Sequence, residues 1–279
     1  MRYKKSALRI LRIKIAALCS LLSIIFLGSS STLKAQISFQ KGQRLFQQRA
    51  ARADSFRADP HVINEAINAL NESIRVNYRP REAAALLLQA YYFKGRYADL
   101  PDDKRKKAFD QARALGINMR ERYPKSAAIA YWYGVNLRQW DHMHNLWQTT
   151  INRTDKKLRD TAQSVIALDS TYYGGGGFRL LAKIHFDTPS IWLIKGWPSD
   201  EKALKFIRKA VKVAPKMPEN RLFYARMLIR FGRKSEAKTQ LQHIYDIKSR
   251  ANHLVEDRFI KYRARQLWQK HLVKKEEDS

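Results

Sequence analysis

The feature that most constrains this chain is a pattern of small and bulky residues near its C-terminus that recurs every 34 residues. Ala203 and Ala237 are one such period apart, and Ile207 and Leu241 have the same separation. Two helices can cross closely only where small side chains meet, and bulky side chains then fill the space against the next pair. The pattern therefore predicts stacked pairs of antiparallel helices.

The full pattern occurs twice in register. The first unit has Ala203, Ile207, Ala210 and Pro215, and the second has Ala225, Gly232, Ala237 and Leu241. A period of 34 with small residues, a turn glycine and a helix-ending proline is typical of tetratricopeptide repeats. We therefore predict an all-α protein, a tetratricopeptide-like α-solenoid of antiparallel helix pairs. The N-terminal part is more degenerate, with Gly95, Ala108 and Gly134 as candidate close-contact residues.

Helical periodicity covers nearly all of the rest, with breaks at prolines, glycines and capping residues. The expected helices are 38–57, 60–76, 80–94, 103–122, 126–140, 154–168, 177–186, 199–213, 218–231, 234–247 and 252–272.

The N-terminus has the composition of a secretory signal peptide. A basic segment is followed by an apolar stretch, Ile15–Gly28, and then by small residues ending at Ala35. We expect a signal peptide over 1–35, the solenoid over 36–273 and a solvated tail over 274–279. Leu18 precedes the only cysteine, Cys19, which disfavours lipid attachment and leaves no thiol for disulfides after cleavage. The prediction is an exported protein, in the periplasm of a Gram-negative bacterium, that contacts the membrane only through this peptide.

Residues 36–279 keep 47 basic and 25 acidic residues, a net charge of +22. Such a charge attracts anionic partners, but the basic residues are spread over every helix and indicate a solvated basic surface. Because an exported chain rarely meets nucleic acid, we expect no nucleic-acid partner. An adhesin for anionic polymers is an alternative.

Four consecutive glycines, Gly174 to Gly177, precede Arg179. Their amides, together with Arg179, could bind a small anion at the start of a helix. However, the lysine and hydroxyl of a nucleotide-binding loop are missing, and no strand precedes the glycines. The favoured interpretation is a tight corner where helices touch, with Tyr172 and Tyr173 packed over it.

Residues 167–233 resemble the T component of TRAP-type transporters, a periplasmic family of tetratricopeptide type. The resemblance rests on the Gly-rich corner, on Arg179 and Leu181 followed by Ala182 where the family has glycine, on Pro189 in a loop, and on Pro215. It implies a non-catalytic protein that docks a solute-binding subunit. Family members are often lipoproteins, a property that this sequence lacks.

Several further residues are candidates for binding or chemistry. The loop 190–200 carries Trp192 and Trp197, which could cover the core or line a ligand or partner site. His142 and His144 are two residues apart, a spacing that does not suit a metal pair on one helix face. We expect Glu256 and Asp257 to lie on a solvated face.

The sequence thus predicts a binding and scaffold protein without catalysis, metal or cofactor. It would dock protein partners of the cell envelope, such as a solute-binding protein, on its concave face, and could hold a small apolar or acidic ligand. The sequence leaves its oligomeric state open. Alternatives are a general envelope scaffold with no transport role and an enzyme that binds a phosphorylated substrate at the Gly174–Arg179 corner.

Overall fold

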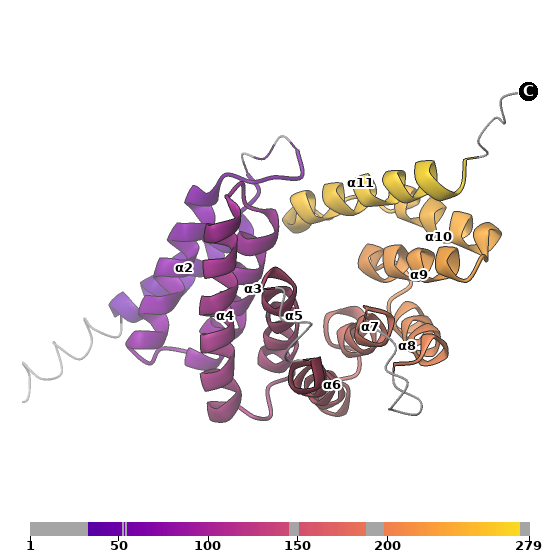
Figure 1. Cartoon of the computed structure of the whole chain (residues 1–279). Helices are drawn as coiled ribbons and strands as arrows, with labels where there is room; N and C mark the ends of the chain where they lie inside the picture. Colours follow the sequence, from indigo (N-terminus) through magenta and orange to yellow (C-terminus); the bar gives the residue numbers. More distant parts are fainter. Residues whose placement is uncertain (1–32, 52, 54, 145–150, 188–197, 274–279) are drawn as a thin grey trace, which may run out of the picture.

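The computed structural model describes residues 33–51, 53, 55–144, 151–187 and 198–273. Within these ranges the chain is an all-α, tetratricopeptide-like solenoid, as predicted, and neighbouring helices pack in antiparallel pairs along an arc (Figure 1). In order, the helices are residues 33–47, α2 (Pro60–Arg75), α3 (Pro80–Tyr97), α4 (Asp102–Arg122), α5 (Ala127–Met143), α6 (Ile151–Leu168), α7 (Tyr172–Asp187), α8 (Asp200–Val213), α9 (Pro218–Arg230), α10 (Lys234–Asp246), η2 (Ala251–His253) and α11 (Leu254–His271).

The helix starts follow from the local sequence. Proline occupies the first position of α2, α3 and α9, where its missing N–H has no helical partner to lose. Side-chain oxygens of Asp59, Ser126 and Ser199 accept hydrogen bonds from backbone N–H groups in the first turns of α2, α5 and α8. These caps place most boundaries within a few residues of the predicted ones.

The first predicted helix, 38–57, was wrong at its C-terminal end. The helix covers 33–47, and a run of turns follows it. Arg49 turns inward there, is 4% exposed, and donates from Nη1 to the Phe46 carbonyl at 2.9 Å. Ala58 then pairs with the end of α3 through hydrogen bonds to the backbone of Tyr97 and Asp99. Contacts distant in sequence thus override the local helical pattern.

The two ends of the arc bury different kinds of core. In the N-terminal part, rings pack directly onto glycines: a Cβ on Gly95 would lie 2.5 Å from the Phe109 ring, and one on Gly116 would lie 2.3 Å from the Tyr133 ring. In the C-terminal part, the repeat residues are buried in two smaller clusters. Ala203, Ile207 and Ala210 belong to one cluster, and Ala225, Ala237 and Leu241 to the other.

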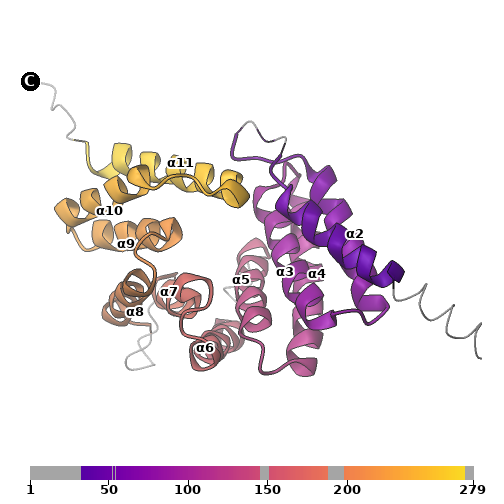
Figure 2. The same cartoon turned by 180° about the vertical axis from the view of Figure 1, so that it is seen from behind.

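The arc returns on itself, so that the start of α11 lies beside Ala53 and Phe56 (Figures 1 and 2). Arg258 donates to the Ala53 carbonyl at 2.7 Å, and the Phe56 ring stacks on Tyr262 with centroids 4.6 Å apart. Phe259 packs edge-on against Tyr97 of α3 at 5.7 Å. The C-terminal helix therefore completes the N-terminal core. Among the described helices, none has the length and apolar character needed to cross a bilayer.

Candidate functional site

The glycine corner is a junction between helices. Gly174 and Gly175 have φ of 63° and 73°, in the left-handed region that glycine enters without penalty. A Cβ on Gly175 would lie 3.1 Å from the Cα of Ala210 in α8, and one on Gly176 would lie 2.5 Å from the Tyr131 ring of α5. The glycines thus let α7 approach both neighbours, the packing role favoured from the sequence.

Tyr173 shares the left-handed conformation, with φ of 48°, although it carries a side chain. Backbone strain of this kind costs about 1–3 kcal/mol and persists where the surroundings enforce it. Here the Tyr173 ring stacks on Tyr131 at 5.3 Å and meets Trp132 edge-on at 4.8 Å. The corner therefore holds Tyr173 against a wall of aromatic rings.

Arg179, one turn after the corner, is 3% exposed and bridges three helices. Its Nη2 donates to the Tyr131 hydroxyl at 2.6 Å, and its Nη1 donates to Asn220 Oδ1 at 2.5 Å. Asn220 Nδ2 in turn donates to the carbonyls of Gly174 and Ala210, at 3.0 and 2.8 Å. This network fixes α7, α8 and α9 relative to one another.

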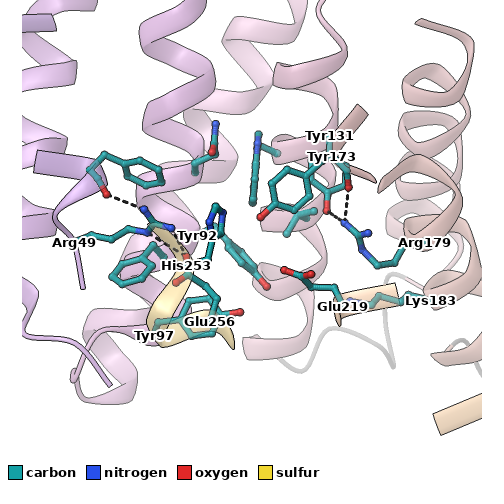
Figure 3. Close-up of a pocket in the computed structure, with 15 residues that line it drawn as sticks. Arg49, Tyr92, Tyr97, Tyr131, Tyr173, Arg179, Lys183, Glu219, His253 and Glu256 are labelled. Atoms are coloured by element: carbon teal, nitrogen blue, oxygen red, sulfur yellow. Dashed lines mark hydrogen bonds and ion pairs between the residues drawn. The ribbon is translucent and has the colours of Figure 1, made fainter. Parts of the chain in front are cut away.

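These groups border a pocket of about 70 Å³ on the inner side of the arc. Figure 3 shows Arg49, Tyr97, His253 and Glu256 on one side, facing Tyr131, Tyr173, Arg179, Glu219 and Lys183 on the other. A volume of this size has room for several water molecules or one small ligand. The complete lining comprises Phe46, Arg49, Gln89, Tyr92, Phe93, Tyr97, Tyr131, Trp132, Val135, Tyr173, Arg179, Lys183, Glu219, His253 and Glu256.

Two carboxylates of the pocket each have one oxygen engaged and one without a partner. Glu256 Oε1 pairs with Arg49 Nη2 at 2.5 Å, and a Glu219 carboxylate oxygen pairs with Arg250 Nη2 at 2.9 Å. Their Oε2 atoms are buried and have no hydrogen-bond donor among the described residues. Burial raises the pKa of Glu256, and the charge of Glu219 adds to the increase. The pocket therefore has unused acceptors on both sides, Glu256 on one and Glu219 on the other.

Basic groups with unused donors lie on the same side as Glu219. Burial lowers the pKa of Lys183 to about 7, helped by the guanidinium groups of Arg138 and Arg179. Lys183 lies 5.7 Å from the Phe223 ring centroid, and no described carboxylate or carbonyl accepts a hydrogen bond from it. Asp187 pairs with Arg138 rather than with Arg179. Arg138, Arg179 and Lys183 also line a smaller adjoining pocket.

Only some of the predicted site residues lie at a pocket. Gly175, Gly176 and Gly177 are buried against other helices, Gly176 also lines the adjoining pocket, and Arg179 lines both pockets. Trp192 and Trp197 lie outside the described residues. Asp169 caps the turn before α7 by accepting from Thr171 N at 2.9 Å.

Sequence reasoning missed most of the pocket. Glu256 and Asp257, expected on a solvated face, are 8% and 2% exposed because the start of α11 packs against the N-terminal part. Arg49, Lys183 and His253 could not be recognised from the sequence, because they lie on separate segments of the chain with no motif between them. His144 contacts Trp140 and Asp110, and no group of three metal-ligating side chains occurs among the described residues.

A second hollow is a groove of about 820 Å³ between α9 and α11. Its lining contains five basic side chains and no acidic one: Arg226, Arg230, Arg263, Lys270 and His271, with Ile229 and Leu267 as the apolar members. Arg230 is held by Asp200 at 3.6 Å and by the Phe186 carbonyl, whereas Arg263 and Lys270 are exposed. The groove thus presents positive charge around a small apolar strip.

No protein-family model matches the chain, and no curated protein resembles its sequence closely enough to count as a relative. Among solved structures, a thermophilic TPR (tetratricopeptide-repeat) protein of Thermus thermophilus superposes with a TM-score of 0.54 at 13% identity, covering 84% of this chain and 100% of its own. PilF of Pseudomonas aeruginosa gives a TM-score of 0.49 at 12% identity, covering 86% of this chain and 93% of its own. MamA of Desulfovibrio magneticus gives 0.44 at 18%, covering 77% and 93%. At this low identity, the similarity to the Thermus protein supports the fold alone. The other two structures superpose too loosely to add support.

Proposed function

We propose that this chain is a non-catalytic binding and scaffold protein of the cell envelope, exported after removal of residues 1–35. It would dock a solute-binding protein on its inner face and hold a small ligand in the central pocket, in the manner of a TRAP transporter T component. The fold supports this proposal because a tetratricopeptide-like arc presents an extended inner surface for binding. The resemblance of residues 167–233 supports the choice of partner.

The basic groove between α9 and α11 is the observation that carries the docking proposal. In Figure 1, α5, α7, α9 and α11 lie on the inner side of the arc, and α6, α8 and α10 lie outside. Exposed Arg263 and Lys270 around Leu267 complement an acidic surface with one apolar anchor. The expected partner is thus an envelope solute-binding protein with an acidic face.

The test purifies the complex from the envelope and identifies the partner by mass spectrometry. We expect a solute-binding protein, whose affinity falls at least tenfold for Arg263→Glu/Lys270→Glu and falls with rising salt. Lys104→Glu/Lys106→Glu changes the charge equally on exposed positions of α4 and should leave the affinity unchanged. Absence of any solute-binding protein, or equal losses in both variants, would refute the docking proposal.

A further inference from the structure

The central pocket contains buried acceptors and unused donors that the described residues do not satisfy. The Oε2 atoms of Glu256, on one side, and of Glu219, on the other, are buried without donors. A buried acceptor that lacks a hydrogen bond costs about 1–3 kcal/mol, and more when charged. Glu256 is only 8% exposed and its Oε2 is covered by protein atoms, so a donor to this oxygen has to come from within the pocket. A ligand that donates N–H groups would remove this cost.

Beside Glu219, around Arg179 and Lys183, donors exceed acceptors. Arg179 uses Nη2 for Tyr131 and the Tyr173 carbonyl and one Nη1 hydrogen for Asn220. Its Nε–H and second Nη1 hydrogen have no acceptor among the described residues, and neither has the Lys183 ammonium. A carboxylate can accept from a guanidinium and an ammonium together.

The charges of the lining select between a cation, an anion and a zwitterion. The lining carries both signs: Arg49, Arg179 and Lys183 lie with Glu219 and Glu256. A ligand with a single charge would engage either the free carboxylate oxygens or the free donors and leave the other set unpaired. A ligand with both charges engages both sets. Much of the remaining lining is aromatic, including Tyr92, Tyr97 and Trp132, which favours an apolar group and the face-on approach of an ammonium.

We propose that this pocket binds a small zwitterion, an α-amino acid with a short apolar side chain. Its ammonium group would donate to Glu219 Oε2 and Glu256 Oε2, and its carboxylate would accept from Arg179 and Lys183. This names the ligand class for the ligand-binding part of the proposed function and rests on that part. The volume of about 70 Å³ limits the ligand to a few heavy atoms beyond the two charged groups.

The test is calorimetric titration of the full chain with L-valine and two analogues that each lack one charged group. Isobutylamine keeps the ammonium and side chain, and isovalerate keeps the carboxylate and side chain. We expect L-valine or L-alanine to bind, and each analogue to bind at least tenfold more weakly than valine. Binding of either analogue as tightly as valine, or no binding of both amino acids at millimolar concentration, would overturn the proposal.

Two variants identify which side chain binds each charged group of the ligand. Glu219→Gln should weaken valine and isobutylamine but not isovalerate, whereas Lys183→Gln should weaken valine and isovalerate but not isobutylamine. Glu201→Gln and Lys205→Gln remove the same charges from exposed positions of α8 and should change nothing. Equal losses for all three ligands in Glu219→Gln and Lys183→Gln would contradict the assignment. Partner capture through the α9–α11 groove is measured without amino acids, so a failure of the ligand class and a failure of docking are separate results.

Discussion

Residues 33–143 pack aromatic rings onto glycines, whereas residues 200–272 pack alanines against branched side chains at a regular spacing. The first region forms one large cluster that includes Tyr91, Phe93 and Trp132, and the second forms two small ones. The regular region can stack unit on unit because each interface repeats the last. The aromatic region is irregular, and its tyrosine and tryptophan side chains provide hydroxyl and N–H groups. The pocket lies where the two meet, so the irregular region supplies its walls and the regular region supplies Glu219, His253 and Glu256.

The largest expected effect comes from breaking the link between the regions. Asn220→Ala removes hydrogen bonds to Gly174, Ala210 and the buried Arg179 guanidinium, and should lower the free energy of unfolding by about 3 kcal/mol. Urea unfolding followed by circular dichroism measures it. Asn118→Ala on an exposed face of α4 is the control. A loss no larger than in the control would show that the network does not hold the corner.

Gly95→Ala sharpens the contrast between the two cores. Alanine favours the helix by up to about 1 kcal/mol, but its Cβ would lie 2.5 Å from the fully buried Phe109 ring, and overpacking costs about 1–3 kcal/mol. We expect a net loss of stability in thermal unfolding that Phe109→Leu partly restores. A more stable Gly95→Ala variant would contradict the ring-on-glycine description.

Gly232→Ala is the matching change in the regular region and should be milder. Gly232 has φ of 71° in the turn after α9, and a Cβ there would meet no atom within 4 Å. Only the left-handed backbone is penalised, by about 1 kcal/mol. Gly232→Asn should lose less in the same unfolding assay, because asparagine tolerates this conformation. A loss as large as that of Gly95→Ala would mean that the turn packs more tightly than described.

The smallest effect is the pH dependence of the closed arc. Burial, with Arg250 and Arg49 nearby, lowers the pKa of His253 to about 4, while Glu219 and Asp257 oppose the shift. Below pH 6.5 the unfolded chain therefore takes up a proton that the folded chain refuses, and folding weakens as the pH falls from 6.5 to 4. His253→Gln should lose less stability over this interval in urea titrations. If the difference in unfolding free energy between the wild type and His253→Gln stays constant with pH, this explanation is contradicted.

How much the sequence predicts depends on how far apart the interacting residues lie. Ala203, Ile207, Ala237 and Leu241 follow a local period, so the fold class and most helix boundaries could be predicted. The glycine corner could also be interpreted as a helix junction, because glycines without the lysine and hydroxyl of a nucleotide loop have few other uses.

The pocket depends on contacts that no local pattern records. Arg49 and Glu256 are separated by 207 positions, and each is a charged residue that normally stays exposed. Their burial follows from the return of α11 to the start of the chain, which also explains why the helix predicted to reach 57 ends at 47. The resemblance to the transporter family bears on the corner and its following helices but says nothing of this closure.

A double-mutant cycle between Arg49 and Glu256 tests most directly whether the two ends meet around the pocket. Arg49→Met and Glu256→Gln are measured singly and together by urea unfolding. A buried charged pair in contact should give a coupling energy of about 1–3 kcal/mol. Effects that add to within about 0.5 kcal/mol would mean that the ends do not meet, and would contradict the closed arc and its pocket.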